Sequence, residues 1–424
     1  MKSVLIASVG GSRAPIVAAL ASRRPDLAVF LASMSAPGQP GSAEEVPAIL
    51  REAQRPGQPH EIIAVPATQV DDPEAVFLCL NEHIRALRAE YPKAELRFDY
   101  TGGTKSMTSA LFQVALATPG TTLQFMGGRR ATLTHVTPGT ERPNVIAVDW
   151  LLAERTMARL QAAWGSFAYG EAAAGAQFLL DDLAGDEKAP PDLVRRLEDF
   201  AAASRAFDDW DRFRHTEAAQ ALEALAPRHP DLLPFAERAR RCAGAEAPRL
   251  ADLWRNAERC ASRFRFDDAV ARCYRLIEWV AQWRLRDRHG IDPSNMDWSR
   301  LSDQEVERIR AEDQRRRGRT TLSGLMQALD LLAAREPQGP VARFLAQTYP
   351  NRPRQTGEGR LRDMLDLRNR SILAHGDQPL GEPDWARMAE FMASFHAAVL
   401  APLLREAGAP HDPPQLPRRT PRSL

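Results

Sequence analysis

One short segment near the carboxyl end of the chain combines the types of side chain that RNA cleavage without a metal ion needs. Residues 368–376 read Arg-Asn-Arg-Ser-Ile-Leu-Ala-His-Gly. The imidazole of His375, with a reference pKa of about 6.5, can transfer a proton near neutral pH. A guanidinium, from Arg368 or Arg370, can hold the charged phosphorus centre that forms when a 2′-hydroxyl attacks it. With Asn369 between the two arginines, the segment predicts a ribonuclease site.

We expect one helix to end at His375, with Gly376 as the glycine that stops it. At about 100° per residue, two positions seven apart nearly superimpose on a helix, as Arg368 and His375 would. Arg370 precedes His375 by five residues and would diverge from it by about 140°. Arg368 is therefore the preferred partner of His375, and Arg370 is the reserve.

The segment also has a purely structural interpretation. A histidine at the end of a helix often interacts only with the last carbonyl groups, and arginines there are usually solvated. Cleavage needs both a base and an acid, while one chain offers one histidine in this segment. A catalytic interpretation therefore favours a homodimer that pairs two such segments across a symmetry axis.

Three loops near the amino end are rich in Gly, Ser, Thr and Arg, and each follows a predicted strand. They span residues 8–13, 101–106 and 127–130. In a parallel sheet they would share the edge where open α/β sheets bind ligands. Glycine amides, a helix N-terminus and a lysine suit an anion, although the glycines could instead serve only tight turns. The candidate ligand-binding residues are Gly10, Gly11, Ser12, Arg13, Thr101, Gly102, Gly103, Thr104, Lys105 and Ser106.

Several common sites are not predicted. Thr104 and Asp99 occupy positions where a P-loop needs glycine, and the first loop lacks the G-x-G-x-x-G pattern of dinucleotide-binding proteins. The four cysteines form no C-x2-C pair and the histidines no H-E-x-x-H, so neither a metal nor a cofactor is expected.

The composition describes a globular protein without a membrane segment. The chain has 424 residues, of which 44% are hydrophobic and 26% charged, with a formal net charge of +1. This balance does not predict general attraction to nucleic acid, so any RNA contact must come from a local patch. No apolar run approaches the roughly 18 residues of a membrane helix. We expect a cytoplasmic protein with reduced cysteines.

The order of predicted elements divides the chain into four parts. Residues 1–150 alternate strands and helices, which predicts an α/β Rossmann-like domain with a mostly parallel sheet. Residues 151–250 predict an all-α helical connector, and residues 251–405 a helical bundle. Residues 406–424, rich in proline and arginine, are expected to be a disordered tail.

Both candidate sites resemble known families. The segment 368–376 resembles the R-x4–6-H motif of HEPN-domain ribonucleases, and residues 266–278 resemble the opening helix of that bundle in CRISPR-associated members. Residues 8–12 and 99–105 resemble the CARF domain of CRISPR-associated proteins. The resemblance implies an ancillary type III CRISPR ribonuclease, in which a CARF domain senses cyclic oligoadenylate and a HEPN domain is the effector.

The resemblance also implies chemical details. HEPN enzymes act without metal, cut single-stranded RNA and leave 2′,3′-cyclic phosphate ends, as homodimers. It favours cyclic tetra-adenylate over cyclic hexa-adenylate as the activator. In the helix that opens the bundle, Arg275 and Glu278 stand three apart and either face the active site or pair on the helix surface, which is the expected role.

Three alternatives remain open at this stage. The protein could be a non-catalytic CARF regulator that binds nucleic acid or a protein partner. It could be a HEPN toxin whose first domain senses another nucleotide. In addition to the main interpretation, the rim of loops could slowly cleave its own ligand through Thr104 and Lys105.

Overall fold

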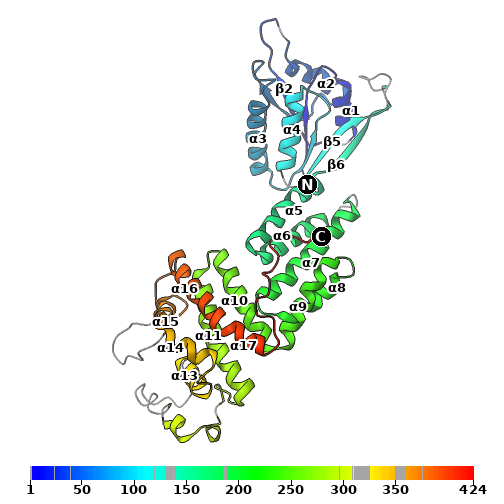
Figure 1. Cartoon of the computed structure of the whole chain (residues 1–424). Helices are drawn as coiled ribbons and strands as arrows, with labels where there is room; N and C mark the ends of the chain where they lie inside the picture. Colours follow the sequence, from blue (N-terminus) through cyan, green and yellow to red (C-terminus); the bar gives the residue numbers. More distant parts are fainter. Residues whose placement is uncertain are drawn as a thin grey trace. The chain divides into compact units, whose positions relative to one another are not determined.

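The computed structural model describes most of the chain in two compact units (Figure 1). Unit 1 comprises Met1–Ala158 and Phe178–Leu197, and unit 2 comprises Arg159–Gln177 and Glu198–Leu424. The structure describes all residues except 1, 23, 39, 119, 130–136, 138–139, 185–188, 296, 308, 310–324, 349–359 and 375.

Unit 1 contains a six-stranded sheet of order β3-β2-β1-β4-β5-β6. Strands β1 to β5 pair in parallel, and β6 pairs antiparallel with β5. The predicted α/β fold is thereby confirmed. The elements are β1 Ser3–Ser8, α1 Ala14–Ser22, β2 Leu27–Ser33, η1 Ser42–Glu45, α2 Val46–Glu52, β3 His60–Val65, α3 Pro73–Glu90, β4 Glu95–Asp99, α4 Lys105–Ala117, β5 Thr121–Gly127 and β6 Arg142–Ala147.

Helices cover both faces of this sheet because successive side chains of a strand point to opposite faces. Along β1, Val4 and Ile6 pack in the same core as α3 and α4, whereas Leu5 and Ala7 pack with α1 and α2. The connections run in opposite directions from β1 and β4, which are neighbours. The loops after these two strands therefore flank the crevice where doubly wound sheets bind ligands.

The remainder of the described chain is helical, which confirms the second half of the predicted fold. The helices are α5 Val148–Ala163, η2 Trp164–Ser166, α6 Tyr169–Leu183, α7 Pro191–Asp211, α8 His215–Leu225, η3 Pro230–Leu232, α9 Leu233–Gly244, α10 Glu246–Ser262, α11 Phe266–His289, η4 Trp298–Arg300, α13 Leu325–Arg335, α14 Pro340–Thr348, α15 Arg360–Arg370, α16 Glu382–Phe395, η5 His396–Leu400 and α17 Ala401–Glu406.

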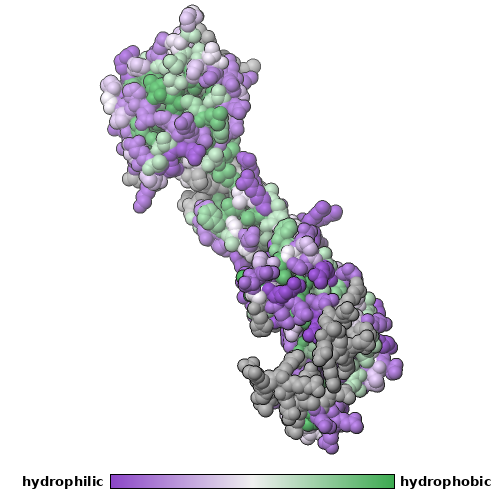
Figure 2. Space-filling model, turned by 90° about the vertical axis from the view of Figure 1, so that its left-hand side faces the viewer, coloured by the Kyte–Doolittle hydropathy of each residue, from purple (hydrophilic) through white to green (hydrophobic). Residues whose placement is uncertain are grey.

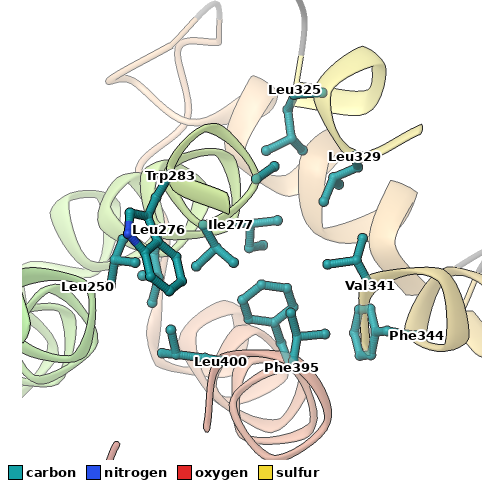
Figure 3. Close-up of a cluster of buried hydrophobic side chains, with 14 of the residues drawn as sticks. Leu250, Leu276, Ile277, Trp283, Leu325, Leu329, Val341, Phe344, Phe395 and Leu400 are labelled. Atoms are coloured by element: carbon teal, nitrogen blue, oxygen red, sulfur yellow. The ribbon is translucent and has the colours of Figure 1, made fainter. Parts of the chain in front are cut away.

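The bundle of unit 2 has one large apolar core. Leu276 and Ile277 of α11 lie in it with Phe344 of α14 and Phe395 of α16 (Figure 3). Helix α16 begins at Glu382, after the N-cap residue Gly381. Asp384 Oδ2 accepts a hydrogen bond from the N–H of Gly381 at 3.1 Å, within the first turn.

The tail, expected to be disordered, instead lies against the helices of unit 2. Its prolines lack N–H groups, and their carbonyls accept hydrogen bonds from helix side chains. Arg255 donates to Pro413 at 2.8 Å, Arg238 to Pro414 at 2.6 Å and Tyr169 to Pro417 at 2.7 Å. Gln415 accepts a hydrogen bond from the fully buried Arg259 at 2.7 Å, and Leu416 is buried. We call residues 410–424 the strap.

The described surface is mainly hydrophilic on the face shown in Figure 2, with apolar residues interspersed. Among the described helices, none has the length and apolar character needed to cross a membrane. Within the same residues, no three His, Cys, Asp or Glu side chains gather as a metal site would require.

Candidate ligand rim and nuclease motif

The loops after β1 and β4 meet through their glycines. A Cβ atom on Gly10 would lie 2.4 Å from the backbone nitrogen of Gly103, and one on Gly102 would lie 2.7 Å from the carbonyl oxygen of Ser8. Gly103 has a φ of +94°, which favours glycine. The hydroxyl of Ser8 also donates to the carbonyl of Gly102. These three glycines therefore serve first to let the two loops approach each other.

A buried carboxylate shapes the second loop. Asp99, 2% exposed, accepts hydrogen bonds from the N–H of Thr101 at 3.0 Å and from Gln124 at 2.8 Å. The hydroxyl of Thr101 donates to Asp99 at 2.5 Å and accepts from the N–H of Met126 at 2.7 Å. Burial raises the pKa of the Asp99 carboxyl. Thr101 thus links β4 to β5, and its hydroxyl already has both a donor and an acceptor partner.

Thr104 and Arg13 also have partners within the fold. Thr104 is the N-cap of α4, accepting from the N–H of Met107 at 3.3 Å, and its hydroxyl donates to the carbonyl of Val70 at 3.0 Å. The guanidinium of Arg13 forms ion pairs with Glu45 and with Glu52. The pKa of the Arg13 guanidinium is raised, mainly by its hydrogen bond to Glu45. Both residues therefore hold the loops in shape.

A subset of the predicted residues faces outward from this rim. Gly11, Ser12 and Lys105 are exposed, and Ser106 is half-buried. A Cβ atom on Gly11 would meet nothing within 4 Å. Lys105 and Ser106 open α4, where the helix dipole favours negative charge. Gly11, Ser12, Lys105 and Ser106 can therefore contact an anionic ligand. In contrast, Gly10, Thr101, Gly102 and Gly103 make the contacts that hold the loops together.

The helix that carries the nuclease motif ends earlier than predicted. Helix α15 stops at Arg370 and not at His375, which lies outside the described residues. The chain then turns, because the carbonyl of Ser371 accepts hydrogen bonds from the N–H groups of Ala374 at 3.0 Å and Gly376 at 3.2 Å. The helical projection that favoured Arg368 over Arg370 therefore does not apply between residues 370 and 375.

Gly376 brings the chain back against the end of α15 after this turn. A Cβ atom on Gly376 would lie 1.8 Å from the carbonyl oxygen of Arg370. The prediction that Gly376 stops the helix as its C′ residue is wrong. The backbone of Gly376 instead packs on the last helical residue. The two described neighbours of position 375 are thus held against the end of α15.

The three polar side chains at the end of α15 have different surroundings. Arg368 is half-buried, with its guanidinium carbon 4.7 Å from the centroid of the Tyr274 ring of α11. It also donates to the side-chain oxygen of Asn369 at 3.3 Å. Asn369 and Arg370 are exposed. Arg370 is therefore the arginine more open to a phosphate group.

Helix α11 confirms one predicted pair and adds contacts that the sequence did not indicate. Arg275 forms the expected ion pair with Glu278 at 2.7 Å. The contacts of Tyr274 with Arg368 and of Trp279 with Arg275 were not predicted, since they depend on how the helices pack. The available signal was Tyr274 next to Arg275, with Trp279 about one helical turn after Arg275.

Comparisons with known proteins agree with this architecture. Residues 239–398 match the family model described as the Csm6 HEPN domain. The chain is similar in structure to Enterococcus italicus Csm6 bound to cyclic hexa-2′-fluoro-hexa-dAMP, with a TM-score of 0.59 and 12% sequence identity over 96% of this chain and 95% of that one. This likeness shows that the chain has the fold of that Csm6.

Two further solved structures match about half of the chain. Can2 from Sulfobacillus thermosulfidooxidans, in complex with cyclic tetra-adenylate, has a TM-score of 0.24 and 12% identity over 54% of this chain and 69% of that one. The protein VC1899 from Vibrio cholerae has a TM-score of 0.26 and 10% identity over 50% and 68%. No curated protein has a matching sequence.

Proposed function

We propose that this chain, which carries a Csm6 HEPN domain at residues 239–398 and has the fold of Csm6, is an endoribonuclease of type III CRISPR defence activated by cyclic oligoadenylate. The observation that carries the proposal is the family match, because it spans α15 and the motif at residues 368–376. The rim of unit 1 supplies a second site suited to an anionic ligand.

In the nuclease site, we assign the phosphate contact to Arg370 and proton transfer to His375. The 2′-hydroxyl oxygen of the RNA attacks the adjacent phosphorus and gives its proton to a base. The bond from phosphorus to the 5′ oxygen then breaks, and that oxygen takes a proton from an acid. The products are a 2′,3′-cyclic phosphate and a 5′-hydroxyl, so no metal ion is required by the chemistry.

The assignment of Arg370 rests on its surroundings. Its side chain is exposed, and its carbonyl oxygen is the atom against which Gly376 packs. Arg368 already contacts Tyr274 and Asn369, so we assign it the role of positioning the end of α15. Asn369, exposed between them, is available to a ribose or phosphate oxygen.

A homodimer would complete both sites. Two motifs would supply one base and one acid, and two rims would face a ring whose rotational symmetry matches a two-fold axis. In each rim, Lys105, Ser106 and the amides of Gly11 and Ser12 would contact the phosphodiesters. Binding of the ring would favour the dimer geometry in which the two nuclease motifs align.

The test compares activators. A fluorescent single-stranded RNA reporter is incubated with the protein and no ring, cyclic tetra-adenylate, cyclic hexa-adenylate or a cyclic dinucleotide. We expect cleavage with one adenylate ring only. The resemblance to CARF and HEPN families favours the tetra-adenylate, whereas the Csm6 structure of similar fold holds cyclic hexa-2′-fluoro-hexa-dAMP. Ring binding without cleavage would identify a non-catalytic regulator, and activation by a different nucleotide would identify a toxin with another sensor.

The structure does not favour Thr104 as a group that cleaves the ring. Its hydroxyl donates to the carbonyl of Val70 and accepts from the N–H of Met107. Lys105 remains exposed and is assigned to binding.

A further inference from the structure

Arginine and aromatic side chains alternate across three helices next to the nuclease motif. The guanidinium carbon of Arg368 in α15 lies 4.7 Å from the ring centroid of Tyr274 in α11. Farther along α11, the guanidinium carbon of Arg275 lies 5.6 Å from the ring of Trp279, and that of Arg249 in α10 lies 5.7 Å from the same ring. We call Tyr274, Arg275, Trp279 and Arg249 the track.

The members of the track on α11 share one side of that helix. At about 100° per residue, positions 274, 275 and 279 fall within an arc of about 140°. The residues that α11 buries in the core lie mainly outside this arc, and include Leu276, Ile277 and Val280. Arg275 is exposed, and Tyr274, Trp279 and Arg249 are half-buried. The track is therefore part of the surface of the bundle.

Arginines outnumber glutamates beside the track, in a chain whose net charge is +1. Two glutamates accompany the track: Glu278 pairs with Arg275 at 2.7 Å, and Glu246 accepts from the indole N–H of Trp279 at 2.5 Å. Glu246 is also paired with Arg286, which lies on the same side of α11. Arg249, Arg275, Arg286 and Arg368 therefore accompany Glu246 and Glu278 at the track, while Asp267 and Asp268 lie on the same side of α11 in its first turn.

We propose that the track is a subsite for the single-stranded RNA that leads into the nuclease motif. The inference rests on the proposed function and adds where the substrate lies. Single strands are bound by aromatic rings that stack with bases and by cations that follow the phosphates. The track offers both, in contact with Arg368 at the end of α15. Guanidinium groups that alternate with rings suit the polyanionic RNA better than they would suit the apolar surface of a protein partner.

The aromatic residues and the arginines of the track are assigned different roles in RNA binding. Tyr274 and Trp279 are half-buried against the core of the bundle, and we assign the exposed part of each ring to contact with bases, a contact that tolerates sequence because every base can stack. Arg275 and Arg249 contact phosphates, and therefore make binding dependent on salt. Arg249 lies on α10, so an RNA strand bound along the track would contact both α10 and α11 as well as the end of α15.

The test measures RNA binding separately from cleavage. A fluorescent single-stranded RNA with 2′-O-methyl groups cannot be cut, because the attacking hydroxyl is blocked, and its anisotropy reports binding to the full-length protein. We expect Arg249→Gln/Arg275→Gln to weaken binding about ten-fold and to reduce the dependence on salt by about two phosphate contacts. With cleavable RNA, KM should rise by a larger factor than kcat falls.

Two control variants keep the result interpretable. Arg240→Gln removes an exposed arginine of α9 that is paired with Glu223 at 2.7 Å, as Arg275 is paired with Glu278, and should leave RNA binding unchanged. Trp279→Phe retains a ring and should bind RNA better than Trp279→Leu. Thermal unfolding of each variant checks the fold.

The outcomes separate this inference from the proposed function. Unchanged binding and KM in the double variant, with active wild type, would overturn the track and leave the ribonuclease assignment intact. If the wild type cleaves no RNA with any ring, the proposed function fails, and the anisotropy of the uncut RNA still tests the track. Equal loss of binding in Arg240→Gln would also overturn the track. The loss would then come from the general removal of positive charge and not from this surface.

Discussion

The guanidinium of Arg368 lies over the ring of Tyr274, with 4.7 Å between the guanidinium carbon and the ring centroid. This contact, which the sequence did not indicate, joins the end of α15 to α11. It gives Arg368 a position within the fold, whereas Arg370, two residues later, is exposed. The two arginines of the motif are therefore expected to behave differently when they are replaced.

Replacing Arg370 with alanine should reduce ring-activated cleavage by at least about 100-fold, the usual effect of removing a group that stabilises developing charge. Stability should change by no more than about 0.5 kcal/mol because the side chain is exposed. Arg368→Ala should lower the unfolding temperature as well as the activity. Reporter cleavage and thermal unfolding measure both variants. A larger loss of activity without loss of stability in Arg368→Ala would reverse the assignment.

Gly376→Ala should disrupt the turn after α15. Its new Cβ atom would lie 1.8 Å from the carbonyl oxygen of Arg370, a backbone atom that cannot move without the helix end. We expect a loss of about 1–3 kcal/mol and most of the activity. The matched control is Gly381→Ala, where the nearest atom would be Pro383 Cδ at 3.5 Å. Wild-type activity and stability in Gly376→Ala would show that the turn is not needed.

The rim of unit 1 offers a comparison between adjacent glycines. Gly10→Ala would place a Cβ atom 2.4 Å from the nitrogen of Gly103 and push the two loops apart, whereas Gly11→Ala would meet nothing within 4 Å. Binding of the activating ring, measured by calorimetry, should weaken at least about ten-fold in Gly10→Ala. Ring binding that is equally tight in both variants would mean that the close approach of the loops does not shape the ligand site.

The strap should contribute to the stability of unit 2 through Gln415. Its side chain accepts from Arg259 at 2.7 Å, and Arg259 is fully buried. Gln415→Ala would leave that guanidinium nitrogen without this acceptor, at a cost of about 1–3 kcal/mol. Urea unfolding followed by fluorescence measures the loss. Arg422→Ala, at an exposed position of the same strap, is the control, and equal effects of the two variants would contradict the role of Gln415.

The sequence predicted the alternation of strands and helices well, because buried parallel strands such as β1 are continuously apolar and α3 and α4 begin with capping residues. It also indicated two candidate sites, whose residues stay predictions. It did not predict the end of α15, because the stop comes from a turn centred on the backbone of Ser371 and not from the glycine at position 376. Helical periodicity cannot register such a turn.

The strap was also missed, and the reason is general. Its proline and arginine content is typical of disordered segments, but its order depends on donors elsewhere in the chain, such as Arg238 and Arg255. In the rim, the residue types indicated a ligand site, but the role of each residue could not be predicted from its type. Thr101 and Thr104, selected as ligand-binding hydroxyls, have hydrogen-bond partners within the fold that only the packing of the loops reveals.

The central claim is a ligand-gated cleavage that uses His375 and no metal ion. The most direct measurement follows reporter RNA cleavage in EDTA by the wild type and by His375→Ala, with ring binding to each protein measured alongside. We predict that the wild type cleaves only with the activating ring, and that His375→Ala binds the ring equally well but does not cleave. Cleavage by His375→Ala at the wild-type rate, or complete loss of wild-type activity in EDTA, would contradict the account.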